Sequence, residues 1–535
     1  MTDAGRTSRA AVGMGAIAAM SRVVGFIRVL VVAAVLGTTY LGNAFQSANS
    51  VSNILFELLA AGALSAVLVP AFVDLLDAGD DEGAEQVAGG VLGVALAVLG
   101  AVTLVGIVAA PLLARALTIG VPESSATEQR ELVTYLLRFF VPQVVLYAAG
   151  AIATAVLYAK RRFAVTAAAP IGNTVVMVAC LLAFRAAAGP RPGFDLTSGE
   201  RWLLVAAGTG GVVAFVGSLL ISCRAAGFRL RPRWPRGDER VAALLRHSGW
   251  GVVLHTGAGL LLAGAVIGGG AVEGGVVAYQ VAWVFFLAPY AILAQPIHTA
   301  ILPELVAEAR DADLERFRTS IRWSLERMAL FVLPVTAALM ALALPAMRVV
   351  SFGAARAEGP ELLAAALAAL AVGLLPYGAF LLLARAYYAL GDSRTPGLVS
   401  VASALVGVLV MAGGAVTSDG WARVAVLAAG HSAAYAVGAA VLFVGLGRRT
   451  GGALWPRGLA RMIATCTAVG SGAWLVARDA LGADASRLSG LLGVAAISLV
   501  AGGAVALAYR SLRLTGSLTR RVPAVGVVEP PEVLT

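Results

Sequence analysis

The chain is a succession of long apolar segments separated by short polar connections. Prolines inside these segments, among them Pro111, Pro142 and Pro296, predict bends. Most segments exceed the roughly 20 residues that an α-helix needs to cross a bilayer, so the pattern predicts an all-α polytopic membrane protein. We place fourteen segments near residues 10–36, 43–73, 87–118, 132–159, 163–187, 202–224, 247–272, 275–307, 321–350, 361–391, 397–417, 421–446, 457–480 and 486–510.

The second apolar segment carries a stripe of polar side chains. With about 100° of rotation per residue, the stripe occupies an arc of roughly 120° on one face of a helix. Such a stripe lines a cavity, or it forms hydrogen bonds between helices in the lipid, which is the alternative that we keep. Its members are Asn43, Gln46, Ser47, Ser50, Asn53 and Glu57.

Two arginines, Arg22 and Arg28, lie inside the first apolar segment. A charge at the centre of a bilayer costs roughly 2.5–3.5 kcal/mol on insertion scales, so both side chains are expected to face protein or water. In a straight helix they would be about 120° apart and about 9 Å apart along the axis, which suits the border of a wide cavity. We therefore favour a cavity, and predict substrate binding by Arg22, Arg28, Asn43, Gln46, Ser50, Asn53 and Glu57.

An internal repeat divides the chain. Pro70 and Pro303 are 233 residues apart within similar sequences, and the pairs Pro111–Pro345 and Pro142–Pro376 are 234 apart. Each unit holds six helices, which predicts two lobes related by an axis along the membrane normal, with the substrate site between them. We predict an N-terminal lobe at 1–235, a C-terminal lobe at 236–447, two further helices at 448–511 and a cytoplasmic tail at 512–535.

Composition and charge place the chain in a membrane. Hydrophobic residues make up 59% and charged residues 13%, far from the composition of soluble domains. Of the 40 lysines and arginines, 26 fall on the side of both termini and 10 on the other side, which predicts cytoplasmic termini. The net charge of +10 therefore reflects topology rather than nucleic-acid binding. The basic stretch at residues 229–246 predicts an amphipathic interfacial segment attracted to anionic lipid.

Candidate chemistry is sparse. The three cysteines form no CxxC pair, and no metal site, cofactor site, nucleotide loop, HExxH motif or nucleophile elbow is present in the sequence, so we expect no enzyme. His255 and His431 lie within apolar segments, and His298 lies near an expected bend. Histidine titrates near neutral pH, so each is a candidate proton carrier. A hydrogen-bonded packing role is the favoured alternative for all three.

Four motifs resemble a known family: SRVVGFIR at 21–28, AGALSAVLVPAF at 61–72, ILPEL at 301–305 and YYALGDSRTP at 387–396. They are similar to motifs of the MurJ (MviN) lipid II flippases of the MOP superfamily, over most of residues 10–400. The resemblance implies a V-shaped, two-lobe transporter of fourteen helices that works in peptidoglycan biosynthesis and cell shape. It would carry undecaprenyl-pyrophosphate-linked precursor across the bacterial cytoplasmic (inner) membrane by alternating access.

The resemblance also implies roles for particular residues. Arg22 and Arg28 would contribute to a cationic central cavity, and the last two helices would form a groove for the lipid tail. The implied partners are the anionic lipid-linked precursor, membrane lipids and proteins of cell-wall synthesis or division, with no nucleic acid.

Several family charges are replaced in this chain. The departures are Val29, Asn43, Ser52, Phe56, Glu57, Ala61, Ala282 and Trp283, and the acidic ion-site residues of the seventh and eleventh helices have no counterpart. Two alternatives therefore stay open: a divergent paralog that flips another polyprenyl-linked glycan or amphiphile, and a non-transporting membrane scaffold of the cell-wall machinery. A multidrug exporter is disfavoured because residues 457–510 add two helices.

Overall fold

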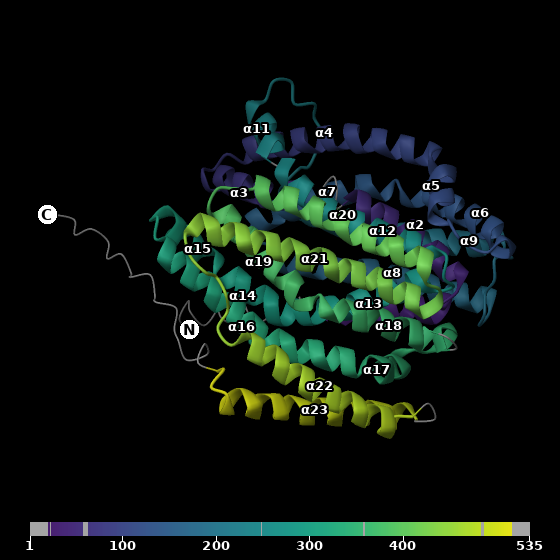
Figure 1. The fold of residues 1–535 in the computed structure, drawn as a ribbon. Helices are drawn as coiled ribbons and strands as arrows, with labels where there is room; N and C mark the ends of the chain where they lie inside the picture. Colours follow the sequence, from purple (N-terminus) through teal and green to yellow (C-terminus); the bar gives the residue numbers. More distant parts are fainter. Residues whose placement is uncertain are drawn as a thin grey trace, which may run out of the picture.

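The computed structural model describes residues 20–21, 23–56, 62–247, 249–356, 359–482 and 486–515. These residues form helices joined by short turns, with no β-strand among them (Figure 1). The first half contains a helix at Val23–Leu36, α2 (Tyr40–Phe56), α3 (Gly62–Asp77), α4 (Asp81–Val108), α5 (Ala110–Leu117), α6 (Glu123–Phe140), α7 (Gln143–Ala159), α8 (Phe163–Ala188), α9 (Ser198–Val205), the π-helical turn η2 (Ala206–Gly210) and α10 (Gly211–Ala225).

The second half continues the same architecture. It contains α11 (Glu239–His247), α12 (Gly249–Gly270), α13 (Gly275–Pro289), the π-helical turn η3 (Tyr290–Ala294), α14 (Gln295–Ala300), α15 (Leu302–Arg310), α16 (Leu314–Ala341), α17 (Ala343–Val350), the 3₁₀ turn η4 (Gly353–Arg356), α18 (Gly359–Val372), α19 (Leu374–Ala389), α20 (Arg394–Thr417), α21 (Gly420–Thr450), α22 (Leu459–Ala480) and α23 (Arg487–Ser511).

The prediction of an all-α polytopic membrane fold is confirmed. Eleven helical stretches of the described chain are long and apolar enough to span a bilayer, or twelve if α18 and α19, which meet at 44°, count as one span. The helix at Val23–Leu36 and the pair α2 and α3 fall in the first two predicted segments. Each of the fourteen predicted segments is thus represented by helix.

The helix bounds repeat along the chain with an offset of 233. In this register α2 matches α13 at its last residue, α3 matches α15 at its last residue, and both ends of α4 match both ends of α16. The caps repeat too: the Asp80 carboxylate accepts from the Gly83 N–H, and the Asp313 carboxylate accepts from the Arg316 N–H. These correspondences link the halves residue by residue, whereas the lobe boundary near residue 235 stays a prediction.

The proline pairs that suggested the repeat are less regular than the helices. Pro142 precedes α7 as its N-cap, whereas Pro376 is the third residue of α19. Pro111 and Pro345 likewise occupy the second and third positions of α5 and α17. The first turn of a helix has N–H groups without intrahelical partners, so a proline is tolerated at several positions there. The break in the helix is repeated rather than the exact proline position.

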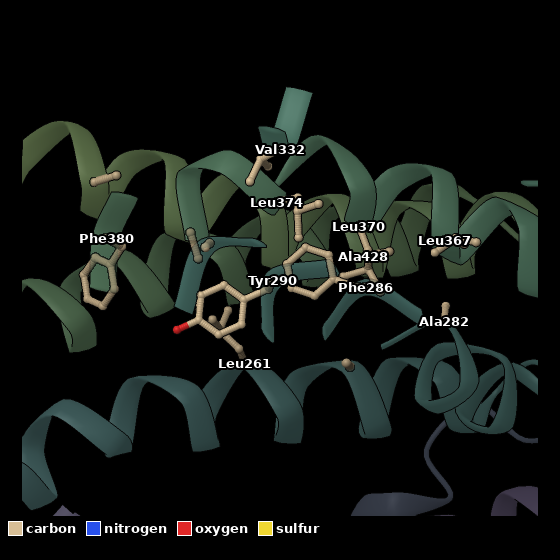
Figure 2. Packing of buried hydrophobic residues seen from close by; sticks show 14 of the residues in the cluster. Leu261, Ala282, Phe286, Tyr290, Val332, Leu367, Leu370, Leu374, Phe380 and Ala428 are labelled. Carbon is tan, nitrogen blue, oxygen red and sulfur yellow. The ribbon is translucent and has the colours of Figure 1, made fainter. Parts of the chain in front are cut away.

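Buried apolar side chains form separate clusters in the two halves. The largest cluster, part of which Figure 2 shows, is drawn almost wholly from residues 261–454. Two others come mainly from residues 32–241. The exceptions mark the contact between halves, because Ala33 packs in the second-half cluster while Val266 and Val276 pack in a first-half cluster. Smaller clusters join α16 to α22 and α23, which lie at one edge of the molecule (Figure 1).

The basic segment between α10 and α11 is held tightly against α4. We call residues 228–236 the arginine strap; its Phe228 is buried, and its four arginines are exposed. The Arg233 N–H donates to the Gly89 carbonyl at 2.9 Å. A Cβ added to Gly93 would lie 2.0 Å from the Arg233 carbonyl oxygen. The glycines of α4 therefore permit the backbones to approach, and fix the strap at this end of the bundle.

Gly93→Ala should release the arginine strap. The added methyl group would overlap the Arg233 carbonyl oxygen, which belongs to the backbone and cannot move aside as a flexible side chain can. We expect a loss of about 1–3 kcal/mol in the free energy of unfolding, measured as a lower Tm in detergent. Gly100→Ala is the matched control, since a Cβ there meets nothing within 4 Å, and should raise stability by up to about 1 kcal/mol. Equal Tm values for the two variants would contradict the tight packing.

Candidate functional site

Arg28 lies on the helix Val23–Leu36, which is next to both halves. Its side chain is partly buried and lies close enough to Tyr147 of α7 to interact with it electrostatically. Two residues earlier, the Phe26 ring meets the Phe285 ring of α13 edge to face at 4.7 Å between centroids. The helix therefore lies near α7 in the first half and contacts α13 in the second. Arg22 and Glu57 fall outside the described residues, so their roles stay predictions.

Asn43 joins α2 to the turn between α12 and α13. The side chain has no exposed surface. Its amide nitrogen donates to the Val272 carbonyl at 2.7 Å, and its amide oxygen accepts from the Val276 N–H at 3.1 Å. Both ends of the amide are thus matched to backbone groups of the other half. In this conformation Asn43 connects the halves through hydrogen bonds, as the alternative reading of the polar stripe expected.

Ser50 makes a second connection between the halves. Its hydroxyl donates to the Gln46 carbonyl at 2.7 Å and accepts from the Gln280 side-chain amide of α13, also at 2.7 Å. Sequence reasoning missed Gln280, although it lies 233 residues after Ser47 and so repeats a stripe position. A polar residue inside an otherwise apolar helix was the available signal.

The remaining stripe residues differ in their surroundings. Gln46 is 8% exposed and Asn53 is half-buried. Neither side-chain amide hydrogen-bonds to another residue in the described part of the chain. Ser47 is fully buried and its hydroxyl has no hydrogen-bond partner there. These three side chains keep unused donors and acceptors next to the contact between halves, and their substrate-binding role stays a prediction.

The break between α6 and α7 is stabilised by hydroxyl groups from neighbouring helices. The helix is interrupted at Pro142, and two carbonyls before the proline accept hydrogen bonds from other helices. Ser52 of α2 donates to the Phe140 carbonyl, and Thr209 of η2 donates to the Phe139 carbonyl at 3.0 Å. In a membrane such carbonyls need internal partners because lipid offers none. The bend thus depends on side chains from two other helices.

The three histidines that the sequence singled out have different environments. His431 of α21 is 4% exposed and shares a hydrogen bond of 2.7 Å between its Nδ1 and the Tyr279 hydroxyl. His298 of α14 pairs through Nε2 with the Tyr290 hydroxyl at 3.1 Å. His255 of α12 is only half-buried. The structure therefore places two of them in hydrogen-bonded pairs with tyrosine.

The GDSRTP segment has a structural role outside the spans. Asp392 accepts hydrogen bonds from the backbone and hydroxyl of Thr395 and from Arg449 of α21. Burial acts to raise the pKa of this carboxyl, but the Thr395 and Arg449 hydrogen bonds outweigh it and hold the pKa below its ordinary value. The segment therefore joins the start of α20 to the end of α21.

Comparisons with known proteins give a consistent family. The profile of the family described as "Lipid II flippase MurJ" matches residues 32–484. A "Probable lipid II flippase MurJ" of Rhizobium tropici is 28% identical over 380 residues, which cover 70% of this chain and 69% of the relative. These matches confirm the resemblance that the sequence motifs suggested.

Solved structures share the fold. A "Lipid II flippase MurJ, inward closed conformation" superposes with a TM-score of 0.71 at 17% identity, covering 94% of this chain and 99% of that one. A multidrug resistance MATE family transporter of the MOP superfamily, in an inward-facing conformation, gives a TM-score of 0.64 at 16% identity, covering 82% of this chain and 98% of the other. At these identities the likeness shows the fold alone.

Asn43→Ala should weaken the contact between the halves, because it leaves the Val276 N–H buried without a partner and leaves the Val272 carbonyl with only the bond from the Gly275 N–H. The unmatched N–H costs about 1–3 kcal/mol, so a clear fall in Tm is expected in detergent. Asn53→Ala is the control, since that amide is half-buried and makes no hydrogen bond within the described residues. A Tm for Asn43→Ala that matches the control would show that the two bonds do not hold the halves together.

Proposed function

Because the chain belongs to the MurJ lipid II flippase family, we propose that it moves the undecaprenyl-pyrophosphate-linked peptidoglycan precursor across the bacterial cytoplasmic membrane. The observation that carries the proposal is the family match over residues 32–484. The chain is a transporter rather than an enzyme. The cargo is amphiphilic: a charged pyrophosphate, a polar sugar-peptide and a long apolar tail each need a different environment within the protein.

The contact between halves supports alternating access. Opening the halves on one side would separate Asn43 from the α12–α13 turn and Ser50 from Gln280. Each freed group costs about 1–3 kcal/mol while it has no partner. Water and the hydroxyl and amide groups of a sugar-peptide offer such partners. The donors and acceptors that hold the halves together in this conformation would therefore bind the cargo in the opened one, together with Gln46 and Asn53.

Arg28 is the described residue best suited to the pyrophosphate. A guanidinium stays charged and offers a fork of donors that matches phosphate oxygens. Arg28 lies on the helix between the halves, where cargo would pass. Arg22, two turns earlier, and Glu57, at the end of the stripe, are assigned by sequence alone, with Glu57 as the group that would compete for the arginines.

The last two helices suit the tail of the cargo. A cavity of about 490 Å³ lies between α17, α18 and α22 and is lined largely by apolar side chains that include Leu344, Trp474 and Leu481. Arg348 and Arg478 also line this cavity. On α23, Leu499 is 77% exposed. These apolar surfaces support the proposal that residues 448–511 accept a polyprenyl chain.

Arg28→Ala should strongly weaken binding of a polyprenyl pyrophosphate to the purified protein. A hydrogen bond to a charged group contributes about 1.5–3 kcal/mol, so the Kd should rise roughly tenfold or more. Glu57→Gln should tighten binding by removing a competing charge, and Arg310→Ala, at the exposed end of α15, should change nothing. Equal affinity in all four proteins would favour the scaffold alternative. Rescue of a flippase-depleted bacterium by the wild type, and not by Arg28→Ala, tests the cargo itself.

We also propose that both termini and the arginine strap lie in the cytoplasm, because most of the basic connections share one side. In a background without Cys180, Cys223 and Cys466, a cysteine replacing the exposed Trp234 should resist membrane-impermeant reagents in intact cells. Ser124→Cys, at the start of α6 on the opposite side, should react. Reversal of the two results would contradict the orientation.

A further inference from the structure

A group of aromatic and imidazole rings in the second half has no place in the transport step described above. We call it the histidine–tyrosine cluster. Its members come from α13, η3, α14, α19 and α21, within the core that Figure 2 shows in part, where the Tyr290 hydroxyl is seen among apolar side chains. They are Tyr279, Trp283, Tyr290, His298, Tyr377, His431 and Tyr435.

His431 is the centre of this cluster. Its Nδ1 shares the hydrogen bond with the Tyr279 hydroxyl, while its Nε2 is buried without a partner in the described residues. A buried polar atom without a partner costs free energy, so its presence calls for a function. In the tautomer whose Nδ1–H donates to the Tyr279 oxygen, Nε2 holds a free lone pair. A proton can bind there and form an N–H bond without any other bond breaking.

Aromatic rings surround His431. The Trp283 ring lies 4.5 Å from the His431 ring, centroid to centroid, and the Tyr435 ring lies at 5.1 Å. The titratable groups that face His431 are Tyr279 of α13 and Tyr435 of its own helix. In the described part of α12, α18, α19 and α20, no charged side chain acts on it.

The cluster continues from His431 toward the predicted cytoplasmic side. Centroid separations are 4.7 Å from Tyr435 to Tyr377, 4.7 Å from Tyr377 to Tyr290, and 5.7 Å from Tyr290 to His298. His298 repeats the pattern of His431, because its Nε2 meets a tyrosine hydroxyl and its Nδ1 is buried without a partner in the described chain. Arg385 donates to the His298 carbonyl at 3.1 Å and marks the end of the series.

We propose that the histidine–tyrosine cluster binds a proton, with His431 Nε2 as the acceptor, and that this proton is the coupling ion of transport. The binding site is independent of the cargo, while the coupling rests on the proposed flippase function. A charged imidazolium is unfavourable in a dry core, so protonation favours the conformation in which His431 reaches water.

Helix α13 connects the proton site to the contact between halves. Tyr279 and Trp283 face His431, while Gln280 bonds Ser50 of α2 and the Val276 N–H bonds Asn43. A movement of α13 relative to α21 would therefore alter the hydrogen bonds that hold the halves together. Binding of a proton and opening of the halves would in this way share one helix.

Trp283 provides a direct test of the proton site, since a protonated imidazole in contact with an indole quenches its fluorescence. The Trp283 signal is the difference between wild type and Trp283→Phe in detergent, followed from pH 8 to pH 5. We expect it to fall as pH falls, and to lose this dependence in His431→Gln. His255→Gln, which changes a histidine outside the cluster, should keep it. A difference signal that stays flat with pH, or one that is unchanged in His431→Gln, would overturn the proposal.

Proteoliposomes test the coupling. A gradient of one pH unit can drive about a tenfold change in the distribution of the cargo per proton. The gradient should therefore accelerate flipping of a polyprenyl pyrophosphate by the wild type and by His255→Gln. It should have no effect on flipping by His431→Gln. Wild-type flipping that ignores the gradient would reject the coupling and leave the flippase function intact. Absence of flipping in every protein, with the Trp283 quench preserved, would reject the function and leave the proton site standing.

Discussion

The two hydrogen bonds of the Asn43 amide are the interaction on which the arrangement of the two halves depends. They are fully buried, and they pair a side chain of α2 with the backbone of the α12–α13 turn. In lipid a separated donor or acceptor finds no water, so the bonds hold unless the site opens. The positions involved are themselves related by the repeat, since Val276 lies 233 residues after Asn43. The contact therefore forms where equivalent helices of the two halves meet.

The same requirement explains the bends. Each interruption of a helix frees carbonyl groups, and here Ser52 and Thr209 supply the missing donors for α6. A bent helix is therefore stable only together with its neighbours, which ties the shape of each half to small polar residues. These residues look like cavity-lining groups in a sequence, and several of them serve the backbone instead.

The two halves share a fold and differ in the chemistry they present to each other. The first half offers Arg28 beside Tyr147, a fixed positive charge suited to an anion. The second half offers His431 among tyrosines and Trp283, the group that would bind a proton. A transporter needs both a site for cargo and a source of free energy, and this division would supply one from each half.

The sequence by itself determined the helical membrane fold, the repeat and the family, because long apolar segments, evenly spaced helix breaks and local motifs are properties of neighbouring residues. The polar stripe was also visible, since a helical period links Asn43 to Asn53. Only the tertiary structure decided that Asn43 and Ser50 bond to the other half, that Gln280 belongs with them, and that His431 and His298 each pair with a tyrosine. Those partners are set by helix packing between distant segments, and the apolar pattern that specifies a helix does not specify which face meets which neighbour.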